Sequence, residues 1–275
     1  MTALRVAELF LYPVKSFRGQ SVKTAMVEAR GLRDDRRWML VDQHGKFMSQ
    51  RTLPALARFS ASIEPCGQHH RLTIEHVDGA RLHIDSDTAG ESIDVTVWSD
   101  TVRAHLPTHA IHEQLSELLG QPARLVYMPD ESLRATDPTY SQPGDIVSFA
   151  DGFPVLVTTT ASLQAVRELT GQDIDRRQFR PNIVIANDEP WQEEQWSQLQ
   201  IGELELDLVK PCTRCVMTTL NPDTGEQDAN RQPLKALAGN KRGHQGVVFG
   251  MNAIARRLGS LKIDDAVQPK FPDQR

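Results

Sequence analysis

Two cysteines in the segment Lys210-Pro-Cys-Thr-Arg-Cys215 are the residues of this sequence with the clearest chemical potential. A Cys-x-x-Cys pair can form half of a zinc site, act as a redox dithiol, or offer a thiolate to another metal. Zinc would need two more ligands, and Cys66 and His70 could supply them only at a spacing unlike familiar zinc patterns. A redox dithiol normally opens a helix, whereas Val216 to Leu220 is rich in β-forming residues. Two buried structural cysteines remain a further alternative.

Positive charge surrounds these thiols, because Lys210 precedes the pair and Arg214 lies within it. Cationic neighbours favour the thiolate over the thiol, and the thiolate is the form that binds metals. A strand should carry the motif, since Leu204, Leu206 and Leu208 alternate with acidic residues just before it. The local residues therefore favour a thiolate presented to a metal at the end of a strand.

A second cluster could bind an anion near the N-terminus. Lys15 and Ser16 follow a predicted strand that ends at Pro13, where an ammonium and a hydroxyl could contact a phosphate. Arg36 or Arg37 downstream could add a guanidinium, whose fork shape matches phosphate oxygens. A solvated turn lysine is the alternative for this cluster taken alone.

A third cluster, Phe179-Arg-Pro-Asn-Ile, stands just before a short β segment. Pro181 can fix the turn that aims Arg180 and Asn182, and the Asn182 side chain offers both donors and an acceptor. Simple capping of the strand is the alternative interpretation.

The bulk properties narrow the class of protein. The chain has 275 residues, enough for one large domain or two modest ones. Its formal charge of −5 and pI near 6.0 argue against a general nucleic-acid-binding protein. The sequence contains no signal-peptide core and no run of about eighteen apolar residues, so we expect no membrane span. An odd count of three cysteines fits a reducing compartment, and we expect a cytoplasmic protein.

Short strands should dominate the first hundred residues, because brief alternating segments recur between turns. We expect one helix after Thr108 that ends at Gly120, and another from about Thr160 to Gly171. The polar segment 129–154 should be a loop, and residues 216–225 should form a hairpin. The fold class is therefore mainly β with a few helices (α+β).

Taken together, the motifs Tyr12-Pro-Val-Lys-Ser16, Gly31 to Trp38, Ser148 to Pro154, Phe179 to Asn182 and Lys210 to Cys215 resemble the MOSC family. MOSC denotes the molybdenum cofactor sulfurase C-terminal domain, and the similarity covers nearly the whole chain. The resemblance implies an N-terminal β-barrel-like module over residues 1–105 and a MOSC β-barrel domain over residues 106–270, interlocked with each other. It is nearest to bacterial hydroxylaminopurine-resistance reductases and the mitochondrial amidoxime-reducing component.

The resemblance also assigns roles to particular residues. It implies that Cys215 is the thiolate ligand of molybdenum and the catalytic centre, with Cys212 as a neighbour of unassigned role. Phe249, Gly250 and Asn252 resemble a late motif that closes the MOSC barrel. The residues implied to bind the cofactor are Lys15, Ser16 and Arg36 at its phosphate, Arg180 and Asn182 near the pterin, Thr159 or Ser162 beside them, and Thr213.

The implied function is a molybdenum-cofactor-dependent reductase of N-hydroxylated compounds such as hydroxylaminopurines or amidoximes. Similar bacterial proteins often carry a C-terminal ferredoxin domain, whose four cluster-binding cysteines do not occur here. We therefore expect no iron–sulfur cluster in this chain and a separate electron donor, a ferredoxin- or flavin-type reductase. A carrier of persulfide sulfur, or of the cofactor itself, without reductase turnover is the alternative. No nucleic-acid or membrane partner is expected.

Overall fold

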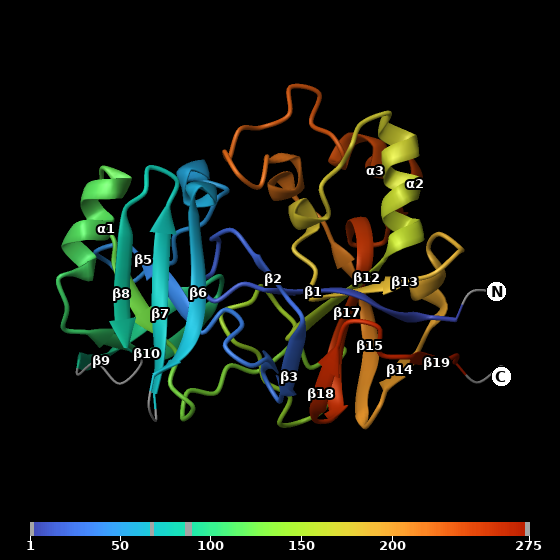
Figure 1. Cartoon of the computed structure of the whole chain (residues 1–275), viewed down its shortest axis with the longest axis horizontal. Coiled ribbons are helices and arrows are strands. Elements are labelled where there is room, and N and C mark those ends of the chain that lie inside the picture. Colours follow the sequence, from blue (N-terminus) through green and yellow to red (C-terminus); the bar gives the residue numbers. More distant parts are fainter. Residues whose placement is uncertain (1–2, 67–68, 86–89, 273–275) are drawn as a thin grey trace.

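A computed structural model of the chain describes residues 3–66, 69–85 and 90–272. Its elements form two lobes that lie side by side (Figure 1). Strands dominate because apolar and polar residues alternate in short segments of the sequence, so that one face of each strand can be buried. In β15 (Leu204–Thr213), for example, Leu204 and Leu206 are fully buried while Glu205 between them is partly exposed.

The larger lobe is built on a curved sheet of nine strands among the described residues. Its strands are antiparallel neighbours apart from β12 and β13, which are parallel and joined through a helix. In order across the sheet they are β19 (Val267–Lys270), β14 (Gln198–Ile201), β15, β17 (Gly246–Arg257), β12 (Val155–Thr159), β13 (Ile183–Ala186), β1 (Arg5–Leu11) and β2 (Gln20–Val22), with β16 (Arg242–Gly243) paired to β17.

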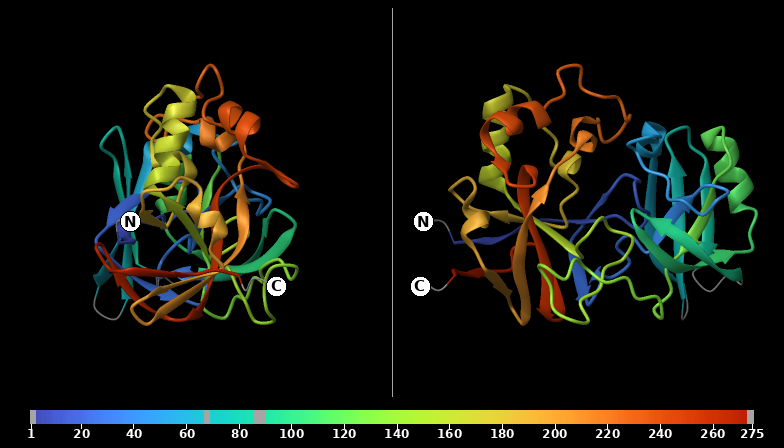
Figure 2. Two further views of the ribbon diagram at one scale, coloured as in Figure 1. Left: turned by 90° about the vertical axis from the view of Figure 1, so that its right-hand side faces the viewer. Right: turned by 180° about the vertical axis from the view of Figure 1, so that it is seen from behind.

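Two helices lie on one side of this sheet, above β12, β13 and β17 (Figure 2). The larger lobe also holds a small sheet and three short 3-10 turns, two of which contribute residues to the site described below. The helices are α2 (Thr160–Thr170) and α3 (Leu234–Asn240). The small sheet runs β18 (Gly259–Lys262), β3 (Thr24–Glu28) and β4 (Gly31–Leu32), and the 3-10 turns are η2 (Arg176–Phe179), η3 (Gln192–Gln195) and η4 (Val216–Thr219).

The smaller lobe packs two sheets and a helix around its own apolar core. One sheet runs β5 (Trp38–Val41), β11 (Arg124–Tyr127), β10 (Asp100–Pro107) and β9 (Gly90–Val97); the other runs β6 (Phe59–Cys66), β7 (His69–His76) and β8 (Arg81–Asp85); α1 (Ile111–Leu119) and η1 (Pro54–Arg58) complete the lobe. The expected division between residues 105 and 106 falls within β10, while β1 and β2 belong to the larger lobe.

The mainly β fold with a few helices is confirmed, although the sheets are not closed barrels of continuous strands. The large sheet instead curls until β1 approaches the segment that leads into β19, where the Val6 amide donates to the Asp265 carbonyl and the Val267 amide donates to the Leu4 carbonyl. These few backbone hydrogen bonds hold the two segments together without a continuous ladder of strand pairing. No helix among the described residues is long and apolar enough to span a membrane.

Local predictions were partly right. Gly120 and Gly171 end their helices in the left-handed conformation, as expected of residues without a Cβ. The first helix starts at Ile111 rather than directly after Thr108. The hairpin expected over residues 216–225 is wrong, because η4 replaces its first strand. The Thr218 hydroxyl donates to the Cys215 carbonyl, and this local bond favours a turn over a strand.

Candidate functional site

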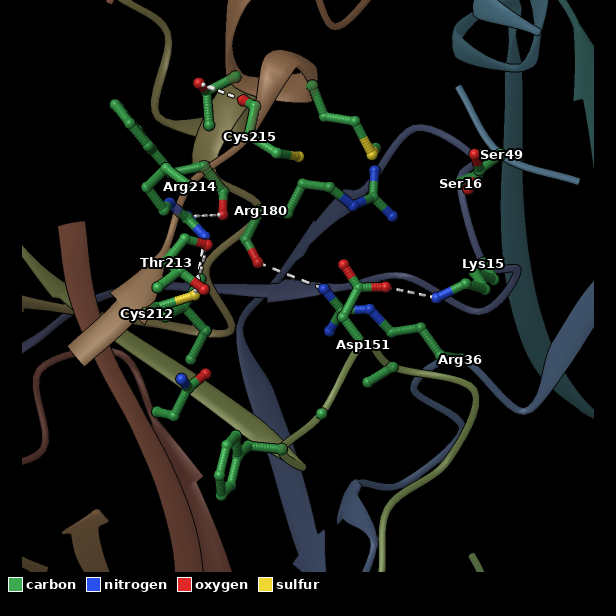
Figure 3. Close-up of a pocket in the computed structure, with 18 of the residues that line it drawn as sticks. Lys15, Ser16, Arg36, Ser49, Asp151, Arg180, Cys212, Thr213, Arg214 and Cys215 are labelled. Carbon is green, nitrogen blue, oxygen red and sulfur yellow. Dashed lines mark hydrogen bonds and ion pairs between the residues drawn. The ribbon is translucent and has the colours of Figure 1, made fainter. Parts of the chain in front are cut away.

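A cavity of about 440 Å³ opens between the two lobes, and both lobes line it. The smaller lobe and the segment that leads into it contribute the region around Lys15, Ser49 and Trp98. The larger lobe contributes the segment around Asp151, Arg180 at the end of η2, and the end of β15 with the two cysteines. Figure 3 shows that Lys15, Asp151 and Cys215, with the other side chains labelled there, lie around a common space. Lys15 and Cys215, which are 200 positions apart in sequence, therefore meet in one site.

The cavity is strongly cationic although the chain as a whole is acidic. Among the described lining residues, only Asp151 carries a carboxylate. Such a concentration of positive charge, partly shielded from water, attracts an anionic ligand more strongly than the same charges would on an open surface. The cationic lining residues are Lys15, Arg36, Arg51, Arg180, Lys210 and Arg214.

Lys15 is the most enclosed of these cations. The turn at Pro13 brings its backbone onto Trp38 of β5, whose carbonyl accepts from the Lys15 amide at 2.8 Å. Its ammonium donates to the Phe149 carbonyl at 2.8 Å and to Asp151 Oδ1 at 2.6 Å. Burial lowers the pKa of Lys15, and the Asp151 carboxylate opposes that change. The ammonium is thus fixed at the cavity wall before any ligand arrives.

Asp151 is held in the charged state by its surroundings. Partial desolvation would raise the pKa of its carboxyl group, but the Lys15 ammonium and the guanidinium groups of Arg51 and Arg36 together lower that pKa below its usual range. Ser16, next to Lys15, adopts a positive φ of 69° and is almost fully buried. Its carbonyl accepts from the Gln50 amide at 2.6 Å, which fixes this strained turn.

Two arginines form the floor of the cavity around Tyr12. The guanidinium carbons of Arg36 and Arg180 lie over the Tyr12 ring, at 4.2 Å and 4.3 Å from its centroid. Arg36 also donates to Asp35, and Arg180 donates to the Phe17 carbonyl at 2.7 Å. Burial and the neighbouring Arg36 charge lower the pKa of Arg180 to about 10. The ring therefore holds two like charges side by side, which prepares them for an anion.

Asn182 lines the cavity, but protein groups already engage its side chain. Its Oδ1 accepts from Arg36 at 3.1 Å and from the Leu156 amide at 3.2 Å. Its Nδ2 donates to the Phe10 carbonyl at 3.3 Å, which links β13, β12 and β1. Asn182 therefore joins three strands and orients Arg36, so its main contact is with the protein.

The two cysteines at the end of β15 are in different environments. The Cys212 sulfur accepts from Arg214 at 3.0 Å, and Arg214 also donates to the Phe179 carbonyl. No hydrogen bond to the Cys215 thiol occurs within the described part of the chain, and Figure 3 shows this sulfur directed into the cavity. The structure therefore separates the pair into a bonded Cys212 and an available Cys215, with Thr213 between them on the cavity wall.

Most of the sequence-predicted site residues meet in this cavity, which brings together Lys15, Ser16, Arg36, Arg180, Asn182, Thr213 and Cys215. Thr159 and Ser162 require correction, because neither lines it. Both are fully buried at the start of α2, where their hydroxyls donate to Glu193 at 2.9 Å and 2.7 Å. Thr159 caps the helix, a role that its position before an apolar stripe also allows.

The residues of the late motif, Phe249, Gly250 and Asn252, also differ in whether they line the cavity. Asn252 lines the cavity, whereas Phe249 stacks on Phe179 behind it, with ring centroids 4.0 Å apart. Gly250 has a positive φ of 73°, and a Cβ there would lie 2.8 Å from the Val157 carbonyl. Within the described residues, no group of three or more histidines, cysteines and acids lies close enough together to hold a metal ion.

Three lining residues of chemical interest were not predicted from the sequence, namely Asp151, Arg51 and Trp98. Asp151 belongs to a motif already noted, Ser148 to Pro154, and its charge before Gly152 was the available signal. Nothing local in the sequence points to Arg51 and Trp98. They reach the cavity only because the smaller lobe folds against the larger one, where the Arg51 guanidinium carbon lies 4.4 Å from the Trp98 ring centroid.

Comparison with known proteins places this arrangement in a family. The family model described as the MOSC N-terminal beta barrel domain matches residues 3–122, and that of the MOSC domain matches residues 144–268. Human mitochondrial amidoxime-reducing component 1 is 29% identical over 95% of this chain and 82% of its own length. Human mitochondrial amidoxime reducing component 2 is 28% identical with the same coverage.

A rice molybdenum cofactor sulfurase is 26% identical over 90% of this chain, which spans 32% of that longer protein. The two family models follow one another along the sequence and together account for most of it. The cavity lies where the two matched regions meet, since Lys15 and Trp98 come from the first and Cys215 from the second. The chain therefore belongs to the MOSC family, with a MOSC domain preceded by a MOSC N-terminal beta barrel domain.

Proposed function

We propose that this protein is a molybdenum-cofactor-dependent reductase of N-hydroxylated compounds, such as amidoximes or hydroxylaminopurines, that takes electrons from a separate protein. The names of its human relatives support this class of reaction. The observation that carries the proposal is the available Cys215 thiol in a cavity lined by cations. That combination suits a cofactor with a phosphate at one end and a metal at the other.

The residues present fit such a group. A soft thiolate is a suitable protein ligand for molybdenum already bound by dithiolene sulfurs, and Cys215 would provide it. Lys15, Ser16 and Arg36 would hold the phosphate, with Arg180 beside the pterin. When bound, the cofactor supplies the two-electron chemistry that removes the oxygen of an N–OH group.

The protein's own part is to fix charge and shape in advance. Arg36 and Arg180 are held by Tyr12, by backbone carbonyls and by Asn182, so they need little rearrangement to meet an anion. Lys15 is equally restrained by Phe149. Groups that are already oriented lose little conformational entropy on binding, which strengthens the interaction. Arg214 donates a hydrogen bond to the Cys212 sulfur, and the Cys215 thiol would be the one that binds the ligand.

Two matched variants test the proposal. Cys215→Ala should lose bound molybdenum and all reduction of 6-hydroxylaminopurine or benzamidoxime. Cys212→Ala, three residues away on the same strand end, should keep stoichiometric molybdenum and most of the activity. Metal content by mass spectrometry, and turnover with a reconstituted ferredoxin or flavin reductase, are the measurements. Retention of both metal and activity by the Cys215→Ala protein would contradict the proposal.

A carrier of sulfur or of cofactor is the second candidate, and the rice relative named as a molybdenum cofactor sulfurase favours it. In that case Cys215 would carry a persulfide, or the cofactor would bind and leave without turnover. Mass spectrometry of the intact protein distinguishes these roles. A persulfide on Cys215 in protein without molybdenum would support the sulfur carrier, and cofactor-loaded protein that transfers its cofactor but never reduces substrate would support the cofactor carrier.

A further inference from the structure

Asp151 occupies an unexpected place for a carboxylate. Its Oδ1 lies 2.6 Å from the Lys15 ammonium, within a cavity whose other described charged lining residues are all cations (Figure 3). An anionic ligand that binds Lys15 would meet this carboxylate at the same atom. Asp151 is therefore either an obstacle to the anion or a part of the mechanism that admits it.

The two partners differ sharply in their freedom to move. The Lys15 side chain is 6% exposed, whereas the Asp151 side chain is 62% exposed. The backbone around Asp151 is fixed, because Arg134 donates to the carbonyls of Ala150 and Asp151. Rotation of the Asp151 side chain into solvent would thus break the pair and leave both the loop and Lys15 in place.

The charges explain why the pair exists without a ligand. A buried ammonium that lacks a counter-charge destabilises a fold strongly. Asp151 supplies that counter-charge, and the neighbouring Arg36 and Arg51 stabilise its ionised form. A phosphate group carries about −1.5 to −2 charges and three acceptor oxygens. It therefore offers Lys15 and its neighbours more than a carboxylate can, while a monoanion offers no such gain.

We propose that Asp151 is an internal counter-ion of the anion site, which an incoming phosphate group displaces from Lys15 and which a monoanion cannot displace. Asp151 thereby selects for the charge of the ligand and neutralises the site while it is empty. The inference rests on the proposed function only in taking the phosphate to be that of the cofactor. The charge selection itself applies to any phosphate ester that fits the cavity.

The test uses full-length protein purified from a host that does not make the cofactor, with inorganic phosphate as the probe. Asp151→Asn keeps the shape and removes the charge, so phosphate should bind at least tenfold more tightly by isothermal titration calorimetry. Asp130→Asn is the matched control. Asp130 is an exposed carboxylate paired to the buried Arg37 outside the cavity, and its loss should leave phosphate affinity unchanged. Equal or weaker binding by the Asp151→Asn protein would overturn the proposal.

A rescue experiment separates charge from shape. In Asp151→Ala, millimolar acetate should refill the vacated place beside Lys15 and compete with phosphate, raising its apparent Kd severalfold. The unmodified protein should be insensitive to acetate and prefer phosphate over it by at least tenfold. Equal affinity of the unmodified protein for the two anions would refute the selection, even if neither variant folds.

Failure of the reductase assignment is visible separately. Tighter phosphate binding by Asp151→Asn in a protein that never acquires molybdenum would support the counter-ion and contradict the proposed function. Full molybdenum loading with unchanged phosphate affinity would do the reverse.

Discussion

Replacing Asn182 by alanine tests whether this residue holds the site together or contacts the ligand. The side chain is 1% exposed and makes three hydrogen bonds, to Arg36, the Leu156 amide and the Phe10 carbonyl. The three distances are 3.1, 3.2 and 3.3 Å, longer than the usual optimum. Even at these lengths they fall within hydrogen-bonding range, and we take the central value of about 1 kcal/mol for each.

The Asn182→Ala protein should lose about 3 kcal/mol of unfolding free energy, because three buried hydrogen bonds of about 1 kcal/mol each are removed. Denaturant titration followed by tryptophan fluorescence measures this loss. Asn240→Ala is the control. Asn240 is exposed and makes one side-chain bond, to the Ala236 carbonyl, so its loss should be within about 0.5 kcal/mol.

The refuting result is specific. A loss of less than about 1 kcal/mol, accompanied by failure to retain cofactor, would mean that Asn182 acts mainly on the ligand. Its hydrogen bonds within the protein would then be incidental. A large loss of stability with normal cofactor content in the folded fraction would confirm that Asn182 positions Arg36 and ties three strands together.

Three further predictions concern Gly19, Tyr12 and Glu193. Gly19→Ala should destabilise the fold by about 2 kcal/mol in a thermal melting assay, because the added Cβ would lie 2.2 Å from the Tyr12 ring. The control Gly239→Ala, whose Cβ meets open space in α3, should be neutral or stabilising in the same assay. Tyr12 has a pKa raised by burial to about 12 from 10.0. Its protonated form therefore stabilises the fold below pH 10, and this contribution is lost as pH rises towards 12, by nearly 3 kcal/mol. Tyr12→Phe should flatten that alkaline decline in denaturant titrations, and an unchanged slope would contradict the assignment. Burial likewise raises the pKa of Glu193, so its stabilising effect is present in acid and lost as pH rises above its folded pKa. Glu193→Gln should be no less stable than the unmodified protein at pH 7, and marked destabilisation there would show that the carboxylate itself is needed.

The sequence by itself determined features that depend only on neighbouring residues, such as strand alternation and helix ends. Leu204, Leu206 and Leu208 specify a strand because alternate side chains face one side of the backbone. Gly120 and Gly171 specify helix ends because they lack a Cβ. The order of motifs also identified the family and most of the cavity, including Lys15 and Cys215, since these residues lie in segments with distinctive composition.

Local patterns failed where a residue's role depends on its partners. Thr159 and Ser162 have the polar groups expected of ligand contacts, but both point to the buried Glu193. Val216 to Leu220 has β-forming residues, yet Thr218 bonds back to Cys215 and bends the chain into a turn. Competition between local hydrogen bonds and strand pairing is decided by neighbours that a short segment does not contain.

Only the tertiary structure decided which charges meet. Lys15 and Asp151 are 136 positions apart, and their contact exists because the turn after β1 packs against the loop before β12. The same packing turns Cys215 into the cavity and leaves Cys212 bonded to Arg214. Coulomb energies depend on distance and burial, and sequence spacing specifies neither at this range. The residue types were therefore readable from the sequence, while their pairing into an anion site was set by the fold.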